Sequence, residues 1–362
     1  MRSNKYICKG KITTMEPIKT AICSFGMSGR VFHAPFLHAN PGFELYSVWE
    51  REKNLAAAIY PAIRTCRTLP ELLSDPATEL VIVNTPNYTH YDYTKQVLQA
   101  GKHVILEKPF TITEQQGLEL IDLAKQTGKK LSSYQSRRFD SDFRTVRRIV
   151  ESGVLGKIVE AEIHYDRFTP TLSPKVHKET PGPGTGLLYD LGAHLIDQAL
   201  QLFGDPEAVF ADLFIIRDNS KVDDYMEVLL YYPGLRVRIK SSYLVREALP
   251  AYSVFGHKGT FIKTRGDVQE KHLLAGDPPI GDEWGVEPLS EQGLLHTEID
   301  GKVIRERVHT EKGSYMDYFN GMYEAIRNNG PLPVTAEQGV RIIRVIEKAY
   351  QSRAEKKLVP FN

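Results

Sequence analysis

The chain has 362 residues, 41% of them hydrophobic and 25% charged, which is typical of a globular protein long enough for two domains. Its formal net charge of +1 gives no electrostatic reason to expect binding to nucleic acid or to an anionic membrane. No apolar run reaches the roughly 20 residues of a membrane helix, and Cys8, Cys23 and Cys66 fit neither a metal spacing nor a disulfide framework, so we expect a cytoplasmic protein without a metal site.

The first half of the chain alternates strand-like and helix-like segments. Residues 1–16 precede this rhythm, and we expect them to form a disordered or weakly attached extension. Within residues 17–137, helical patterns such as 88–100 and 113–126 separate apolar strand candidates at 18–25, 43–49, 79–84, 102–106 and 130–134. This alternation predicts a parallel, doubly wound Rossmann sheet that binds a dinucleotide.

The rhythm changes in residues 138–362, where several strands follow one another without intervening helices. Helical patterns cover 141–152, 187–203, 314–328 and 335–348, and strand-like runs cover 158–168, 208–216, 225–232, 235–245 and 252–255. The segments 169–186 and 276–285 are expected to be loops. We predict an α+β domain with an open, mostly antiparallel sheet, whose exposed face favours a homodimer or homotetramer.

A glycine-containing turn lies between the first strand and the first helix. The segment Ser24–Gly29 is a G-x-G-x-x-G variant with serine in the first position, in the strand–turn–helix context that dinucleotide binding requires. The residues of this turn expected to contact the cofactor are Gly26, Met27, Ser28 and Gly29. Glu50, 21 residues after Gly29, favours NAD because a carboxylate repels a 2′-phosphate, whereas the adjacent Arg51 favours NADP; the balance leans slightly to NAD.

Further polar residues follow later strands, at the same edge of the predicted sheet. In an open parallel sheet that edge binds the ligand. The additional cofactor contacts predicted there are Thr85, Pro86, Asn87, His90, Glu107, Lys108 and Gln135. Asn87 is also expected to cap the following helix.

Three residues form the candidate catalytic group. Lys108 ends a strand between an acid and a proline, and Asp190 and His194 are spaced i, i+4 on one face of a predicted helix. An ammonium, a carboxylate and an imidazole together can transfer protons. Residues predicted with less weight to contact substrate are Arg137, Asp166, Tyr189 and Asp197.

These motifs together resemble the Gfo/Idh/MocA oxidoreductases. The resemblance rests on Ser24–Gly29, Glu107-Lys108-Pro109 and Asp190-x3-His194, and three longer stretches resemble the scyllo-inositol dehydrogenase-like branch: 26–35, 137–143 and 189–198. It covers nearly the whole chain from Ile18. It implies Lys108 as the catalytic lysine with Asp190 and His194 as partners, and an oligomer interface on the C-terminal sheet.

The function expected from these residues and this resemblance is NAD(P)-dependent hydride transfer to or from a secondary hydroxyl of a polyol, inositol or sugar. Two alternatives stay open at this point. One is a redox-neutral, NAD-dependent glycoside hydrolase of the same fold, and the other is a non-catalytic dinucleotide-sensing protein, against which the intact Lys108, Asp190 and His194 argue.

Overall fold

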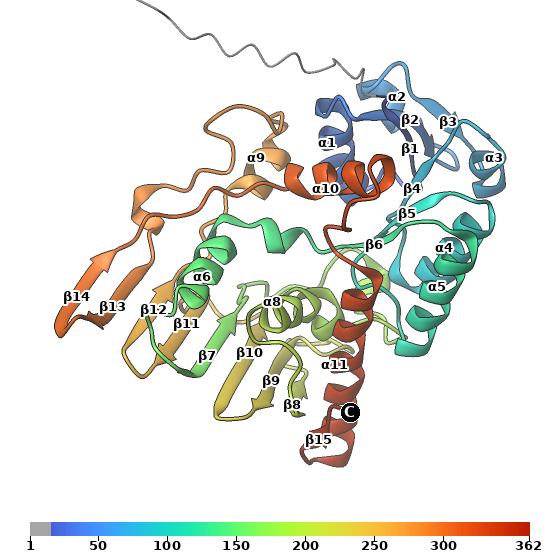
Figure 1. Cartoon of the computed structure of the whole chain (residues 1–362). Coiled ribbons are helices and arrows are strands. Elements are labelled where there is room, and N and C mark those ends of the chain that lie inside the picture. Colours follow the sequence, from blue (N-terminus) through green and yellow to red (C-terminus); the bar gives the residue numbers. More distant parts are fainter. Residues whose placement is uncertain (1–15) are drawn as a thin grey trace, which may run out of the picture.

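The first sheet consists of parallel strands around β1, the strand that leads into the glycine turn. The computed structural model describes residues 16–362, so the expected extension at 1–16 lies almost wholly outside the described residues. The strands of this six-stranded sheet are, in spatial order, β3 (Arg64–Cys66), β2 (Phe43–Trp49), β1 (Ile18–Ile22), β4 (Leu80–Val83), β5 (His103–Glu107) and β6 (Leu131–Tyr134). The predicted doubly wound Rossmann sheet is confirmed (Figure 1).

The strands of this sheet are connected by helices. All four residues of β4 are buried, as expected for a central parallel strand covered on both faces. The connecting helical segments are η1 (Gly29–His33), α1 (Ala34–Ala39), α2 (Leu55–Ile59), α3 (Leu69–Leu73), η2 (Asn87–Thr89), α4 (His90–Gln99), α5 (Glu114–Thr127) and η3 (Ser136–Phe139). Thr113 caps α5 by accepting a hydrogen bond from Gln116, and Gly128 ends it in the left-handed conformation.

The second sheet has nine strands and is mostly antiparallel, as predicted. Its spatial order is β14 (Lys302–Arg307), β13 (Leu294–Ile299), β12 (Gly259–Lys263), β11 (Tyr252–Gly256), β7 (Ile158–His164), β10 (Leu235–Ser242), β9 (Tyr225–Tyr232), β8 (Ala208–Phe214) and β15 (Val359–Pro360). Among these strands β7 and β10 run parallel, and the other neighbouring pairs are antiparallel. The hairpin formed by β13 and β14 lies in a part of the chain for which the sequence predicted no strands.

Helices pack on one face of this second sheet. Those of the second half of the chain are α6 (Ser141–Glu151), α7 (Val176–Glu179), η4 (Leu188–Gly192), α8 (Ala193–Phe203), α9 (Gln269–Ala275), η5 (Leu289–Glu291), α10 (Met316–Arg327) and α11 (Ala336–Glu355). Figure 1 shows α6 and α8 above the sheet and α11 beside β8 at its end. On β8, buried residues alternate with exposed ones such as Phe210 and Phe214, so the other face of the sheet is open at this strand.

The two sheets are joined by C-terminal helices that return toward the N-terminal sheet. Tyr318, Phe319 and Met322 of α10 belong to the same buried cluster as Ile18 and Phe36, and α11 packs against both α5 and β8. The division of the chain at residue 137 therefore stays a prediction, because later residues complete the core beside the first sheet.

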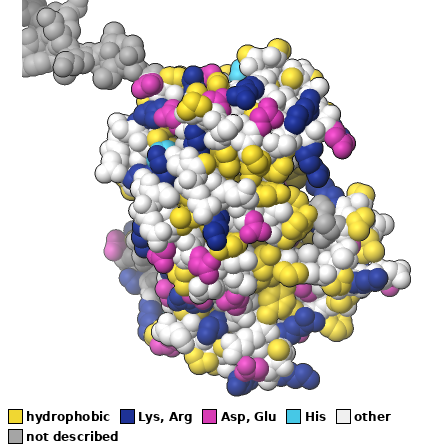
Figure 2. Space-filling model, turned by 90° about the vertical axis from the view of Figure 1, so that its right-hand side faces the viewer, with side chains coloured by type: hydrophobic (Ala, Val, Ile, Leu, Met, Phe, Trp, Pro, Cys, Tyr) yellow, Lys and Arg dark blue, Asp and Glu magenta, His cyan; other side chains and the backbone are white. Residues whose placement is uncertain are grey.

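Apolar side chains also remain on the surface. Figure 2 shows them gathered in a band down the middle of the face that Figure 1 has on its right, with Lys and Arg side chains at its margins. Contiguous apolar surface of this kind marks interaction or ligand sites.

Candidate active site

The main cavity of the molecule lies where the first sheet's strands end and the second half of the chain crosses over them. It has a volume of about 570 Å³. Its walls come from the turn after β1, from the segments after β4 and β5, and from η4, α8, the end of β7 and the loop 169–186. The carboxyl edge of the sheet therefore opens into this cavity, as expected for a doubly wound fold.

The turn after β1 has the space that a pyrophosphate needs. A Cβ on Gly29 would lie 2.1 Å from the carbonyl oxygen of Ser24, so this position requires glycine, whereas a Cβ on Gly26 would meet only the Ser24 hydroxyl at 3.5 Å. Asn84 donates from its amide to Ser24 O at 2.8 Å, while its buried Oδ1 has no hydrogen-bond partner within residues 16–362. The open backbone at Gly26 fits the close approach of a dinucleotide at this turn.

Glu107 links the glycine turn to Lys108. Its carboxylate accepts hydrogen bonds from Ser28 and from the backbone N–H of Lys108 at 3.0 Å, and it faces His33 Nε2 at 2.9 Å. Burial alone would raise the pKa of Glu107, but His33, Ser28 and Lys108 outweigh it and lower that pKa. The carboxylate is thus held ionised beside the turn.

Lys108 and Asp190 meet inside the cavity. The Lys108 ammonium lies 3.0 Å from Asp190 Oδ1 and donates to the Asp190 carbonyl oxygen at 2.6 Å. Lys178, from the short helix α7 in the loop, holds the other carboxylate oxygen at 2.9 Å. Burial would raise the pKa of Asp190, but the two ammonium groups lower it strongly. Asp190 is therefore a fixed anion that orients Lys108.

His194 begins the next turn of the same helical segment and also lines the cavity. Its Nδ1 is buried and has no hydrogen-bond partner among the described residues. Burial, followed by the positive charges of Lys108 and Arg137, lowers the pKa of His194 well below its ordinary value, although Asp190 opposes this. The imidazole is therefore neutral at pH 7.

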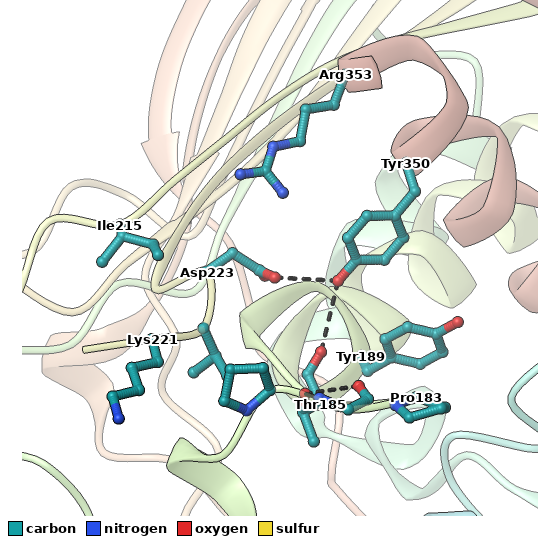
Figure 3. A pocket seen from close by; sticks show the side chains of 12 residues that line it. Pro183, Thr185, Tyr189, Ile215, Lys221, Asp223, Tyr350 and Arg353 are labelled. Atoms are coloured by element: carbon teal, nitrogen blue, oxygen red, sulfur yellow. Dashed lines mark hydrogen bonds between the residues drawn. The ribbon is translucent and has the colours of Figure 1, made fainter.

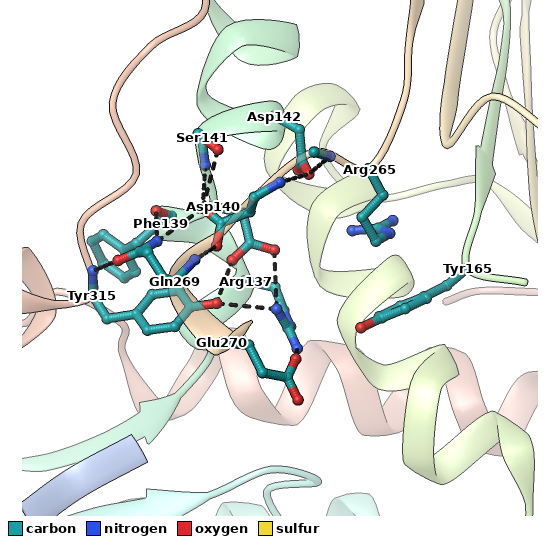
Figure 4. A network of polar contacts seen from close by, with 12 residues as sticks. Arg137, Phe139, Asp140, Ser141, Asp142, Tyr165, Arg265, Gln269, Glu270 and Tyr315 are labelled. Atoms are coloured by element: carbon teal, nitrogen blue, oxygen red, sulfur yellow. Dashed lines mark hydrogen bonds and ion pairs between the residues drawn. The ribbon is translucent and has the colours of Figure 1, made fainter. Parts of the chain in front are cut away.

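A polar network supports the opposite wall of the cavity. Figure 4 shows the Arg137 guanidinium surrounded by Glu270, Asp140 and Tyr315. Arg137 donates to the Tyr315 hydroxyl at 3.0 Å and lies 3.6 Å from the Asp140 carboxylate. These contacts fix its side chain where it lines the cavity.

Most residues predicted for the site do line this cavity. They are Gly26, Met27, Ser28, Thr85, Pro86, Asn87, Glu107, Lys108, Arg137, Tyr189, Asp190 and His194. Asn87 does not cap a helix as expected; its amide instead donates to the carbonyl oxygen of Gly184, which ties the loop 169–186 to the sheet edge. The hydroxyl of Tyr189 donates a hydrogen bond to the carbonyl oxygen of Ile112 at 2.8 Å, so the ring of Tyr189 rather than its hydroxyl faces the site.

Asp197 does not contact the cavity, which corrects its prediction as a substrate contact. Its carboxylate is only 2% exposed and forms two hydrogen bonds with Arg138, at 2.6 and 2.7 Å. Asp197 lies one helical turn beyond His194 on α8, and its carboxylate belongs to the buried core rather than to the cavity wall.

This buried ion pair makes a testable contribution to stability. Asp197→Asn is expected to lower the free energy of unfolding by about 3 kcal/mol, because it leaves the Arg138 charge buried without its counter-charge. Urea unfolding measures the change. Asp205→Asn, which breaks a largely exposed pair with Arg341, serves as the control and is expected to cost less than about 1 kcal/mol. Equal effects of the two substitutions would contradict the core role of Asp197.

Two other predicted site residues turn out to be structural. Asp166 has a side chain only 2% exposed, which accepts from Ser242 N at 3.1 Å and faces His164, so it contacts backbone rather than substrate. The ring of His90 is buried and bridges Pro109 O at 2.8 Å and Thr85 O at 3.0 Å. His90 thus holds two site loops together and does not line the cavity.

The remaining predicted residues lie outside the cavity wall. Gly29 packs against the backbone of Ser24 in the turn. Gln135 is buried, and neither end of its amide has a hydrogen-bond partner in the described part of the chain. The Glu50 carboxylate accepts from the N–H groups of Leu55 and Ala56 at the start of α2, at 3.1 and 3.0 Å, and Arg51 is exposed beside it. Contact of Gln135, Glu50 and Arg51 with a cofactor stays a prediction.

The structure also adds residues that sequence reasoning missed. They are Tyr165, Arg167, Lys178, Arg217, Tyr243 and Glu270. The alternation of residues 158–168 contained the signal for Tyr165 and Arg167, which have the parity opposite to Asp166. For Lys178, on the four-residue helix α7, the sequence offered none. Among residues 16–362 no group of three or more His, Cys, Asp or Glu side chains could hold a metal ion, and no helix there is long and apolar enough to cross a membrane.

A second, smaller cavity of about 330 Å³ adjoins the first behind the loop. Thr185, Tyr189 and Asp223 line both cavities. Figure 3 shows the Tyr350 hydroxyl directed at Asp223, to which it donates at 3.0 Å, and at Thr185. This contact joins α11 to the end of the loop.

The fold and this site define an oxidoreductase with a dinucleotide-binding domain. Residues 18–135 match the oxidoreductase family's NAD-binding Rossmann fold, and residues 147–361 match its C-terminal α/β domain. The chain belongs to the Gfo/Idh/MocA oxidoreductase family, as its motifs indicated.

Two relatives match almost the entire chain, and a third matches about half of it. It is 37% identical over 345 residues to the scyllo-inositol 2-dehydrogenase (NADP(+)) IolW of Bacillus subtilis, which is 95% of this chain and 96% of that enzyme. It is 30% identical over 198 residues, 53% of this chain and 56% of the relative, to the D-glucoside 3-dehydrogenase of Escherichia coli. Among solved structures, an oxidoreductase from Bacteroides fragilis has 47% identity and a TM-score of 0.87, covering 95% of this chain and 100% of that one.

Proposed function

We propose that this protein is an NAD(P)-dependent dehydrogenase that moves a hydride between nicotinamide and a secondary hydroxyl or ketone of a polyol, inositol or sugar. The observation that carries the proposal is the convergence of Lys108, Asp190 and His194 in the cavity into which the glycine turn opens. The likeness to an inositol dehydrogenase and a glucoside dehydrogenase supports the substrate class.

The roles follow from the chemistry of each group. Lys108, held by Asp190, donates a hydrogen bond to the reacting oxygen and stabilises its developing negative charge. Neutral His194 accepts the hydroxyl proton as general base. A bound nicotinamide ring supplies the hydride acceptor. The residues that would hold the dinucleotide are those of the turn and of the two neighbouring strand ends: Gly26, Met27, Ser28, Thr85, Pro86, Asn87 and Glu107.

The choice between NAD and NADP is proposed to depend on Arg51. It is exposed at the end of β2, whereas the adjacent Glu50 carboxylate is already engaged by α2. Arg51→Gln is expected to raise the Kd of NADPH about tenfold and to leave that of NADH within about twofold, because only the 2′-phosphate pairs with a guanidinium. Both Kd values are measured by titrating each dinucleotide and following the quenching of protein fluorescence. A substitution of the exposed Lys53, Lys53→Gln, serves as the control. Equal weakening of both dinucleotides would contradict this role.

Association of two or more copies through the open face of the second sheet is also proposed. Phe210 and Phe214 of β8 are 39% and 60% exposed there, which is unusual for aromatic side chains of a monomer. Phe214→Glu is expected to yield monomers in light scattering coupled to gel filtration. A wild-type protein that is already monomeric would refute the proposal. The expected setting is the cytoplasm, consistent with the free, buried thiols of Cys23 and Cys66.

The dehydrogenase proposal is tested by absorbance at the reduced-nicotinamide band. Purified protein is given NAD or NADP with inositols, aldoses, glycosides and sugar acids. Substrate-dependent reduction of the dinucleotide is expected. Glycoside cleavage without net reduction would instead indicate the redox-neutral hydrolase, and tight dinucleotide binding with no turnover of either kind would indicate a sensor.

A further inference from the structure

The charges that line the main cavity do not all find partners within the protein. Six cationic and five acidic side chains line it. Four of these cations form ion pairs with cavity acids: Lys108 and Lys178 with Asp190, Arg137 with Glu270, and Arg217 with Glu179. Within residues 16–362, Arg167 and Lys175 form no ion pair with any carboxylate, and residues 1–15 contain no Asp or Glu.

Arg167 is nevertheless held in place. Its backbone N–H donates to Ser242 O at 2.9 Å and its carbonyl accepts from Val245 N at 3.0 Å, so the pairing of β7 with β10 is continued through this residue. Its guanidinium lies over the Tyr165 ring, 5.0 Å from the centroid, and donates to the Tyr165 hydroxyl at 3.3 Å. A cation positioned in advance loses little entropy when it binds an anion.

Two further guanidinium groups lie near the ring of Tyr165, in addition to that of Arg167. The guanidinium of Arg265 lies 4.2 Å from its ring centroid and that of Arg137 lies 5.8 Å from it (Figure 4). Burial would raise the pKa of Tyr165, but Arg137, Arg265 and Arg167 lower it. The phenol is therefore a strong hydrogen-bond donor beside the unpaired guanidinium.

Arg167 lies in the same cavity as the proposed catalytic group. Arg167, Tyr243, Lys108 and Asp190 all line this cavity. The two oxygens of the Asp190 carboxylate are bound by Lys108 and Lys178, and Asp190 forms no ion pair with Arg167.

We infer that Arg167 and Tyr165 form a carboxylate-binding subsite and that the substrate is a polyhydroxy acid, such as a uronate or an aldonate. The inference rests on the proposed dehydrogenase function and names its substrate class. A planar guanidinium pairs with both oxygens of a carboxylate, and the Tyr165 hydroxyl adds a third donor.

The experiment compares acids with matched neutral sugars. Binding to the wild-type protein with reduced dinucleotide is measured by calorimetry for glucuronate, galacturonate, gluconate and galactonate, each beside the corresponding aldose or alditol, and kcat and KM are measured for every compound that turns over. The variants are Arg167→Gln, Arg167→Lys and Arg246→Gln. Arg246 is the matched control, because its guanidinium also lies over a ring, that of Phe168 at 3.8 Å, but it does not line the cavity.

At least one acid is expected to bind tenfold or more tightly than its neutral partner. Arg167→Gln is expected to weaken that acid about 10- to 100-fold through KM, with kcat changed less than about threefold. The affinity of Arg167→Lys for this acid should lie between those of the wild type and Arg167→Gln. Arg246→Gln should bind the acid as the wild type does. Neutral compounds and dinucleotide should bind all variants alike.

Two results would overturn the inference. One is that no acid binds better than its neutral partner in an Arg167-dependent way. The other is that Arg167→Gln weakens the dinucleotide instead, which would assign the guanidinium to a cofactor phosphate. Arg167-dependent acid binding without turnover would support the subsite while refuting the dehydrogenase function, so the two failures are distinguishable.

Discussion

Replacing Lys108 with alanine is expected to lower kcat about 10³-fold, or about 4 kcal/mol in activation free energy, while the Kd of the dinucleotide changes less than about threefold. The physical reason is that the Lys108 ammonium lies in the cavity at the end of β5, where Asp190 holds it at 3.0 Å and where it can stabilise negative charge on the reacting oxygen. Single-turnover absorbance measures kcat for the chemical step, and fluorescence titration measures the affinity for dinucleotide.

Lys178 supplies a matched control for this variant. It holds the other oxygen of Asp190 at 2.9 Å but comes from the loop rather than from the end of β5. If Lys108 acted only by neutralising Asp190, Lys178→Ala would lower kcat as much as Lys108→Ala does. We expect Lys178→Ala to lower kcat less than about tenfold. Comparable losses in the two variants, or loss of dinucleotide binding in Lys108→Ala, would remove the proposed role from Lys108.

Replacing His194 with alanine is the second large effect, with kcat for alcohol oxidation expected to fall about 10²- to 10⁴-fold. His194 is expected to act as the general base because burial and the charges of Lys108 and Arg137 keep it neutral. A matched substitution of the exposed His38 should leave kcat unchanged.

The pH profile gives an independent readout of the same residue. The active form of a general base is the unprotonated one, and the pKa of His194 is lowered from its ordinary value of 6.5. The rate should therefore be independent of His194 ionisation from pH 6.5 upward and fall only on the acid side of that value. An acid limb centred above pH 7, or one that survives in His194→Ala, would contradict this assignment.

The fold was predictable because its signals are local and repeated. The apolar run of β4 is buried on every residue, and Thr113 and Gly128 bound α5 as their residue types predict. The short elements α2, α3 and β3 escaped detection, since three to five residues carry no measurable periodicity.

The site was predictable only where the chain itself sets the geometry. Lys108 follows β5, so its place at the sheet edge is determined by the topology, and Asp190 and His194 share one helical segment. The environment of each group was not predictable. Asp197 and Arg138 are far apart in the sequence, and only tertiary packing reveals that they form a buried pair.

The wall formed by the residues that follow β7 shows a different limit. Alternation along residues 158–168 does not tell which parity faces the cavity, and Asp166 was predicted as the substrate contact. The structure places Tyr165 and Arg167 in the cavity wall and turns Asp166 toward Ser242. A one-residue difference in parity exchanges an acid for an arginine, and with it the chemistry of the substrate that the wall can bind.

The most direct test of the central claim is the transfer of deuterium from substrate to cofactor. A polyol or sugar acid that the absorbance assay identifies is prepared with deuterium on the reacting carbinol carbon and incubated with the protein and oxidised dinucleotide. We predict that mass spectrometry finds one deuterium at C4 of the reduced nicotinamide and that the substrate is recovered as the ketone. Deuterium that remains in the sugar product, or reduced nicotinamide without the label, would contradict hydride transfer as the function of this site.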